Sequence, residues 1–419
     1  MYTLIISALV GFALPWQTRF LFRVPIVGGA VWEFGVISIY VSQVLLALWL
    51  AHNAYQNRVR LVWQLRTHLK QRRAQIIFCA CILFLVVQLF ISADKLLTVL
   101  AVINMSLAGG LVTLLYFEKA ARKPFFGGFL IAATFQALLG FLQVVMGGTF
   151  ASTALGMAAH RAADHGAAII EVAGIRHLRA YGGQPHPNIF GAFMLIALLV
   201  YAYMIYTHTE QMQNKNTIQF SVLTTGALFF SFSRSAWLGF LIACVLAWVH
   251  RAHVRDGQRT MLRWALGTFA VLTILFLPFV ISRAIPQTYI EQRSISERGS
   301  ELGQWKHVIE PHWFFGTGLW AYTAALDAPT GDVKVPVHDV PLLKFAEVGL
   351  FGVLFGLFVF FYSGMRVRLT PLIFIAVPML IVDHYLYSLW PGLVISVIGI
   401  SLYLIIAETR VVLAQLDKS

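Results

Sequence analysis

Three residues in the second half of the chain have side chains suited to chemistry between a phosphorylated group and a hydroxyl. His338 lies where a polar segment passes into a long apolar run. Because imidazole titrates near neutral pH, this side chain can accept a proton from a hydroxyl. Arg234 interrupts about thirty residues of apolar chain, and Arg298 lies in the polar segment before His338. Guanidinium groups bind phosphate oxygens through a planar, bidentate fork and keep their charge.

Each of these residues also has a purely structural interpretation. Arg234 can mark the tip of a helical hairpin, with its side chain snorkelling to the membrane surface. Arg298 can be a solvated charge on a loop helix, paired with Glu297 or Glu301. His338 can cap a helix. A charge at membrane depth is costly and usually functional, so we favour the functional interpretation for Arg234. Because Arg298 and His338 occur in the same half of the chain as Arg234, we favour a functional interpretation for them too.

Polar residues near two other apolar runs are weaker candidates. Arg179 and His186 come just before one such run, where they can contact a substrate. Asp383, His384 and Tyr385 interrupt another apolar run. A proton relay is one interpretation of this second group, but we favour a buried pair whose hydrogen bonds are satisfied, or the outward end of a span.

Six histidines in the two polar segments do not indicate a metal. Their spacing is irregular, and no H-E-x-x-H or comparable pair is present. We therefore expect no metal and no cofactor. These histidines are His160, His165, His177, His186, His307 and His312.

The composition identifies the class of protein. Of the 419 residues, 59% are hydrophobic and only 12% are charged, whereas about a quarter of a soluble domain is charged. The net charge of +13 could suggest nucleic acid, but no basic face interleaved with aromatic residues is present. The positive residues cluster in short loops instead, which is a signal of membrane topology.

Apolar runs recur along the whole chain, and about 20 residues suffice for one crossing of a bilayer. We therefore expect an all-α polytopic membrane protein that forms a single membrane domain over residues 1–419. The expected spans, twelve in number, lie at about 2–15, 34–51, 76–92, 96–116, 125–146, 189–207, 218–232, 235–250, 264–282, 341–362, 371–386 and 391–408.

Loop charge predicts the orientation. The basic loops after the second, fourth, eighth and tenth spans fall on one side, which the positive-inside rule makes cytoplasmic. Both termini are then cytoplasmic, and two long segments, residues 147–188 and 283–340, lie outside. Within the second, Ser296 to Glu310 is expected to form an amphipathic helix. Its apolar members would pack on the spans or the lipid interface; they are Leu302, Trp305, Val308 and Ile309.

The stretch around His338 has a specific spacing. His338-Asp339 is followed by nine residues, then Gly349, two residues and Gly352. This resembles the pattern of the O-antigen ligases, in which a histidine and an amide or hydroxyl residue precede a glycine and a second small residue. These enzymes belong to the O-antigen ligase and polymerase superfamily of bacterial membrane glycosyltransferases.

Two other positions support the resemblance, and one departs from it. Arg298 and Leu302 resemble the Arg-x-x-x-Leu motif of the ligases, and Arg234 lies where the family keeps an arginine between two spans. Asp339 replaces the usual amide or hydroxyl residue. As a carboxylate beside His338 it could orient the ring, and we include it among the candidate substrate contacts.

The resemblance implies a GT-C-like fold with a partly helical periplasmic loop between helices 9 and 10. It implies metal-independent, inverting transfer of a glycan from a polyprenyl (undecaprenyl) diphosphate donor to an acceptor hydroxyl. The reaction would take place on the periplasmic face of the bacterial inner membrane. His338 would deprotonate the acceptor, while Arg234 and Arg298 would hold the donor diphosphate. The specific expectation is an O-antigen ligase of lipopolysaccharide assembly, with a lipid A core glycolipid as acceptor.

Other functions stay open at this point. A polysaccharide polymerase or a protein O-oligosaccharyltransferase of the same superfamily would carry the same short motifs. A transporter of lipid-linked sugars would bind the same diphosphate, but it predicts inverted repeats or broken helices in matching halves, which the sequence does not show. A non-catalytic membrane scaffold leaves the placement of the arginines unexplained.

Overall fold

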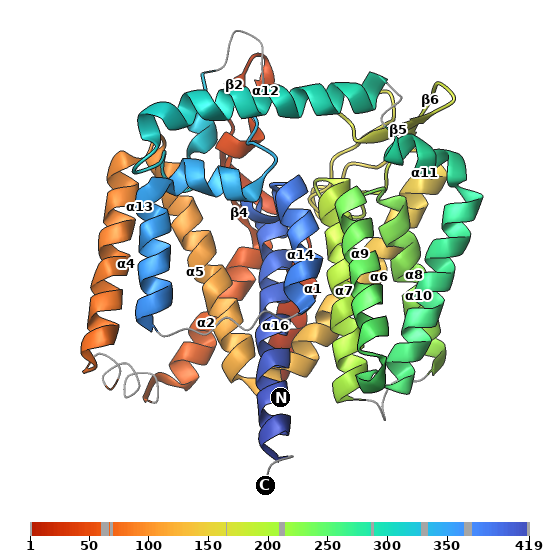
Figure 1. Cartoon of the computed structure of the whole chain (residues 1–419), viewed down its shortest axis with the longest axis horizontal. Coiled ribbons are helices and arrows are strands. Elements are labelled where there is room, and N and C mark those ends of the chain that lie inside the picture. Colours follow the sequence, from red (N-terminus) through yellow and green to blue (C-terminus); the bar gives the residue numbers. More distant parts are fainter. Residues whose placement is uncertain are drawn as a thin grey trace.

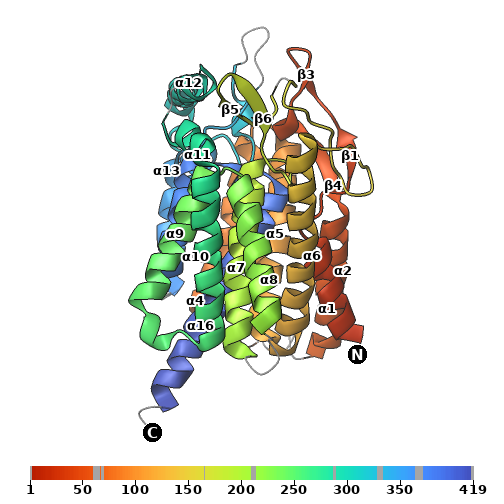
Figure 2. The same ribbon diagram turned by 90° about the vertical axis from the view of Figure 1, so that its right-hand side faces the viewer.

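The computed structural model describes residues 2–59, 67, 70–164, 166–208, 214–285, 289–327, 334–363 and 371–416. Most of these residues are helical, and the helices stand side by side in a bundle (Figures 1 and 2). Short β-ribbons and one long transverse helix cover the upper end of the bundle in Figure 1, which we call the ribbon end. Both chain termini lie at the opposite end, which we call the termini end.

The helices follow the predicted apolar runs closely. Those of the first half are α1 (Tyr2–Ala13), α2 (Val41–Gln56), α4 (Arg72–Ile91), α5 (Lys95–Phe117), α6 (Lys119–Met146) and α7 (Pro187–Thr207). Those of the second half are α8 (Asn214–Phe230), α9 (Arg234–Val249), α10 (Asp256–Leu275), α11 (Leu277–Ala284), α12 (Tyr289–His312), α13 (Val340–Ser363), α14 (Pro371–Val382), α15 (Tyr385–Ser388) and α16 (Trp390–Leu416).

Six of the described helices are long and apolar enough to cross a membrane: α4, α5, α6, α7, α13 and α16 up to Glu408. The pair α10 and α11 would be a seventh, but these two helices meet at 88°. Other predicted runs form shorter helices, such as α1 and α14 with 12 residues each. The structure supports a helical membrane protein, but it does not confirm the predicted count of twelve spans.

Two predicted spans differ from the observed elements for local reasons. The run at 34–51 begins with a strand, because Ile37–Tyr40 pairs with Arg19–Arg23 and α2 starts only at Val41. The run at 264–282 is divided at Phe276, after which Pro278 lies in the first turn of α11. Proline is tolerated in a first helical turn but not in a helix interior, so the chain turns there.

The prediction of an all-α fold missed three antiparallel ribbons, each of two strands. They pair β1 (Arg19–Arg23) with β4 (Ile37–Tyr40), β2 (Ile26–Val27) with β3 (Ala30–Val31), and β5 (Ile169–Val172) with β6 (Ile175–Leu178). The first two belong to the connection between α1 and α2, and the third to the connection between α6 and α7. All three lie at the ribbon end (Figures 1 and 2).

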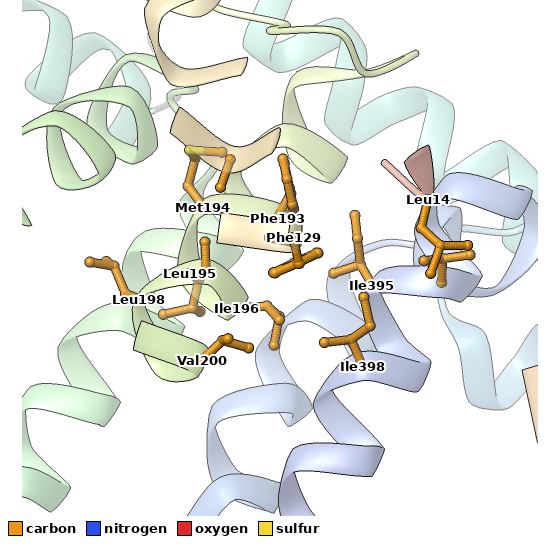
Figure 3. Close-up of a cluster of buried hydrophobic side chains, with 14 of the residues drawn as sticks. Leu14, Phe129, Phe193, Met194, Leu195, Ile196, Leu198, Val200, Ile395 and Ile398 are labelled. Atoms are coloured by element: carbon orange, nitrogen blue, oxygen red, sulfur yellow. The ribbon is translucent and has the colours of Figure 1, made fainter. Parts of the chain in front are cut away.

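The main hydrophobic core surrounds α7. Of the 18 consecutive residues of this helix that are most apolar, 83% are buried, as expected for a helix that is apolar on every side. Figure 3 shows Phe193 and Ile196 of α7 packed with Phe129 of α6 and with Ile395 and Ile398 of α16. Because α16 reaches this centre, the last helix of the chain completes the core.

A single hydrogen bond shows how far apart in sequence the core elements are. The indole nitrogen of Trp390, at the start of α16, donates to Ser42 Oγ at the start of α2 over 2.9 Å. Both residues are buried. This hydrogen bond therefore joins the start of α2 to the start of α16 inside the protein.

Helix α13 is two helices joined at Gly349. This residue has φ 61° and ψ −169°, a conformation that is essentially restricted to glycine. The chain after α12 fills the break: Leu350 N donates to Trp313 O over 2.9 Å, and Thr317 N donates to Ala346 O over 2.9 Å. The break therefore fixes the short first part of α13, which begins next to His338, against the end of α12.

Candidate functional site

His338 lies at the ribbon end, two residues before α13, and it is paired with an acid from α12. Its Nδ1 is 2.7 Å from Oε2 of Glu301. The His338 side chain is 27% exposed and the Glu301 side chain 11%. The imidazole is therefore accessible, while its acidic partner lies mostly beneath the surface.

Asp339 has a different role from the one that its position suggested. Its Oδ1 accepts a hydrogen bond from Leu342 N over 2.8 Å, so its side chain caps the first turn of α13. Aspartate is among the preferred residues for this position. The hydrogen-bond partner of the His338 ring is Glu301, and the carboxylate of Asp339 stabilises the helix that follows.

Helix α12 lies across the ribbon end, almost perpendicular to the bundle (Figures 1 and 2). Glu301 and Val308 are buried on its face toward the bundle, and Trp305 Nε1 donates to Leu342 O over 2.9 Å. Of the four apolar residues expected to pack on the spans or the lipid interface, Trp305, Val308 and Ile309 pack beneath α12. The fourth, Leu302, is 40% exposed.

Arg298 lies one turn before Glu301 on the same side of α12, since residues three apart are neighbours on a helix. Its Nε atom is buried and has no hydrogen-bond partner among the described residues. The charges of Arg298 and Asp383 are close enough to interact. A buried donor of this kind is costly unless something binds it.

His384 lies on the other side of His338, and it is fully buried. The two rings are 5.2 Å apart and meet at 73°. Nδ1 of His384 is 2.7 Å from Ser388 Oγ. Its Nε2 has no hydrogen-bond partner among the residues that the structure describes. Of our two preferred interpretations, the satisfied buried pair therefore fails for His384, and the outward end of a span stays a prediction.

The interpretation as a buried pair with satisfied hydrogen bonds holds for the neighbouring residue, Asp383. The amide nitrogen of Asn188 donates to the Asp383 carboxylate, and the guanidinium of Arg179 donates to the amide oxygen of Asn188. Arg179 Nε also donates to Ser231 O over 2.8 Å. Arg179 is 4% exposed, so it is a buried cation that joins the start of α7 to the end of α8 and to Asp383.

His186 caps the start of α7 and belongs to the same region. Its Nδ1 accepts a hydrogen bond from Asn188 N over 3.1 Å, and its ring lies 4.5 Å from that of Tyr385. Burial holds the pKa of His186 well below its usual value, and the charges of Arg179 and Arg283 add to this effect. His186 is therefore neutral within a group of positive side chains.

Arg234 is the first residue of α9, next to a strained turn. Phe232 has a φ of 47°, which is rare for an aromatic residue, and its carbonyl accepts a hydrogen bond from Arg283 Nε over 3.1 Å. Arg234 Nη1 in turn lies 3.5 Å from Arg283 O. The turn thus brings two arginines together at the ribbon end.

Arg283 and Glu301 are the residues of this region that the sequence did not single out. Arg283 counted only as one of several basic residues of the outer segment, and Glu301 only as an ion-pair partner for Arg298. The proline at position 278 was the available signal for Arg283, because it ends the apolar run and turns the chain toward Arg234.

The described residues contain no group of three or more His, Cys, Asp or Glu side chains that could hold a metal ion. His165 lies outside the described residues. The group of side chains around His338 instead combines a partly exposed imidazole, a carboxylate and several guanidiniums. These groups can accept a proton from a hydroxyl and balance the charge of an oxyanion.

The fold and this site define a polytopic α-helical membrane protein with a cationic site at one end of its bundle. Residues 219–357 match the family model described as O-Antigen ligase. The matched segment includes Arg234, Arg298 and His338, and it supports an O-antigen ligase-like superfamily. No curated protein and no solved structure matches the chain.

Proposed function

We propose that this protein is a membrane glycosyltransferase that moves a glycan from a polyprenyl diphosphate donor to a hydroxyl of an acceptor glycolipid. The family match supports O-antigen ligase or polymerase function in general. Within that range we favour a ligase of lipopolysaccharide assembly that works on the periplasmic face of the inner membrane, with undecaprenyl diphosphate as the carrier and a lipid A core as acceptor.

The observation that carries this proposal is the pair of unsatisfied nitrogens beside His338. Arg298 Nε and His384 Nε2 are buried, and neither has a partner among the described residues. Buried polar atoms in proteins are nearly always hydrogen-bonded. A ligand with oxygen atoms next to the His338 ring would satisfy both nitrogens, and a sugar diphosphate carries such oxygens on its phosphates and its hydroxyls.

The reaction follows from these groups. His338 takes the proton of the acceptor hydroxyl as its oxygen attacks the anomeric carbon. The bond from that carbon to the diphosphate oxygen breaks with its electron pair, and the anomeric centre is inverted. Arg298 and Arg234 balance the charge that grows on the leaving diphosphate, which is the largest electrostatic demand of this reaction.

The other cations of the region extend the same role. Arg179 is held by Ser231 O and Asn188, so its position is fixed before a substrate arrives. Arg283 lies beside Arg234. His186, which is neutral and close to these cations, offers a hydrogen-bonding group to a glycan without adding charge. Fixed donors of this kind cost no reorganisation during the reaction.

The test is His338→Ala in a purified, reconstituted assay with a polyprenyl diphosphate glycan and a lipid A core acceptor. Loss of a general base lowers turnover by about 10²- to 10⁴-fold. Donor binding should stay close to wild type because the arginines hold the diphosphate. Turnover and donor affinity are measured separately, the second by equilibrium binding of the labelled donor.

His307→Ala is the matched control, because His307 is an exposed histidine of α12 and should retain full turnover. A well-folded His338→Ala protein with near-normal transfer would exclude His338 as the base. A protein that transfers glycan to a growing polysaccharide, but not to the lipid A core, would identify a polymerase.

A further inference from the structure

We propose that Glu301 is a positioning residue that holds His338 in the tautomer whose Nε2 is basic. This inference rests on the proposed function and goes beyond it, because no part of the glycosyl transfer described above requires an acid behind the histidine. The observation behind it is the 2.7 Å contact between Glu301 Oε2 and His338 Nδ1.

The contact determines which nitrogen carries the proton. A carboxylate can only accept a hydrogen bond, so Nδ1 of His338 must be the donor. In a neutral imidazole the other nitrogen, Nε2, then holds the lone pair. The tautomer and the direction of the ring are set by the partner of the second nitrogen, as in other histidines that act as bases.

The surroundings of Glu301 favour this role over that of a surface ion pair. Glu301 is 9% exposed, and a buried carboxylate is costly unless a hydrogen bond or a charge compensates for its lost hydration. Trp305 anchors α12 one turn further on, through its bond to Leu342 O. Leu342 belongs to the first turn of the helix that follows His338, so the same helix–helix contact fixes both members of the pair.

The acid also matters during the chemical step. When Nε2 of His338 takes the proton from the acceptor hydroxyl, the ring becomes an imidazolium with Nδ1 still bonded to Glu301. The carboxylate stabilises that positive charge while the new bond from oxygen to the anomeric carbon forms and the bond to the diphosphate breaks. The proton leaves Nε2 for water after the products separate.

The experiment compares Glu301→Gln with wild type in the reconstituted assay. The amide keeps the size of the side chain but loses the charge, and its nitrogen can donate to Nδ1 and so favour the wrong tautomer. We expect the kcat of Glu301→Gln to fall by about 10- to 10³-fold. This loss is smaller than the loss expected when the general base itself is removed. The KM for the donor should change by less than about threefold, since the arginines that hold the diphosphate are untouched. Glu310→Gln, an exposed glutamate of the same helix, is the matched control and should retain full kcat.

Two further measurements separate positioning from a structural role. In protein labelled with ¹⁵N-histidine, the signals that disappear in His338→Asn belong to His338. They should show a protonated Nδ1 in wild type and a protonated Nε2 in Glu301→Gln. In addition, if Glu301 acts through His338, adding Glu301→Gln to His338→Ala should lower the residual turnover by less than about twofold.

The outcomes distinguish this inference from the proposed function. If His338→Ala loses turnover while Glu301→Gln keeps that of wild type, the positioning role is excluded and the base remains. If His338→Ala itself transfers glycan at a near-normal rate, His338 is not the base and the positioning role of Glu301 fails with it. If wild type transfers no glycan from the polyprenyl diphosphate donor, the proposed function fails. If Glu301→Gln does not fold, Glu301→Asp is measured instead, because it keeps the charge on a shorter side chain. A monodisperse Glu301→Asp protein whose His338 is protonated at Nδ1 supports the positioning role. A monodisperse Glu301→Asp protein with unchanged kcat and a protonated Nε2 would exclude it.

Discussion

His338 and Asp339 are neighbours in the chain, yet their side chains have separate partners. His338 is hydrogen-bonded to Glu301 of α12, whereas Asp339 accepts a hydrogen bond from the backbone of the helix that it caps, α13. The two adjacent side chains therefore do different things: the imidazole pairs with an acid of α12, and the carboxylate caps the helix that follows.

The capping role of Asp339 predicts different stabilities for two substitutions of this residue. Asparagine caps a helix about as well as aspartate, while alanine costs about 0.5–2 kcal/mol. Asp339→Asn should keep the thermal stability and turnover of wild type. Asp339→Ala should lower the melting temperature, measured by fluorescence-detected thermal unfolding in detergent.

A fall in turnover for Asp339→Asn at unchanged stability would show instead that the carboxylate takes part in the reaction. Ser300→Ala is a suitable control for the stability measurement, because Ser300 is an exposed residue inside α12 whose hydroxyl bonds only to the backbone one turn earlier.

The residues of the site could be predicted from sequence only where their chemistry is unusual for their location. Arg234 in an apolar run and His338 at the edge of one meet this condition. Glu301 does not, because an acid in a polar loop is ordinary. Its burial depends on a contact with a residue 37 positions away in the chain, and hydrophobic periodicity contains no information about such contacts. Periodicity grouped Leu302 with Trp305, Val308 and Ile309, but it gave no signal for the burial of Glu301.

At the scale of elements, the break in α13 determines how α12 and the start of α13 meet. A Cβ atom added to Gly349 would lie 2.4 Å from Phe314 O and 2.6 Å from Gly316 N. These neighbours are backbone atoms, which cannot move away as a flexible side chain can. Backbone geometry thus accounts for a glycine at position 349.

Gly349→Ala should therefore destabilise the protein strongly. The unfavourable backbone conformation costs about 1–3 kcal/mol, and overpacking costs about as much again. We expect a large loss of monodisperse protein in size-exclusion chromatography, together with a loss of glycan transfer.

Gly356→Ala is the matched control for this substitution. Gly356 lies in the second part of the same helix with no atom within 4 Å of its added Cβ. Alanine is favoured over glycine inside a helix by about 0.5–1 kcal/mol, so this variant should be at least as stable as wild type. Equal yields of the two variants would contradict the role assigned to Gly349.

The elements were predictable where an apolar run is uniform and had to be corrected where the backbone changes direction. The run at 96–116 became α5 with almost the same bounds. The strand Ile37–Tyr40 is as apolar as a span, so hydropathy could not separate it from α2. The breaks near Phe276 and at Gly349 depend on backbone geometry, which hydropathy averaged over about twenty residues does not detect.

At the scale of the whole molecule, the ribbon end carries the candidate site, and both chain termini lie at the other end. Because loop charge predicts cytoplasmic termini, we expect the ribbon end to be periplasmic. Ala163 lies in the connection between α6 and α7 at the ribbon end, and Gln71 lies just before α4 at the other end. Both residues are exposed.

Cysteine labelling in intact cells tests this orientation. In a protein whose three native cysteines are replaced, Ala163→Cys should react with a membrane-impermeant maleimide, whereas Gln71→Cys should react only after permeabilisation. Labelling of Gln71→Cys in intact cells, with Ala163→Cys protected, would reverse the orientation and place the site in the cytoplasm.

The central place of α16 has a consequence for how the protein is made. Helix α7 emerges from the ribosome well before α16, yet α16 packs against it in the core. The bond from Trp390 to Ser42 joins residues 348 positions apart. The earlier helices must therefore stay in the membrane in an incomplete arrangement until α16 has been made. A truncated chain would keep most of its apolar segments but lack the helix that closes the core, which makes it a natural target for membrane quality control.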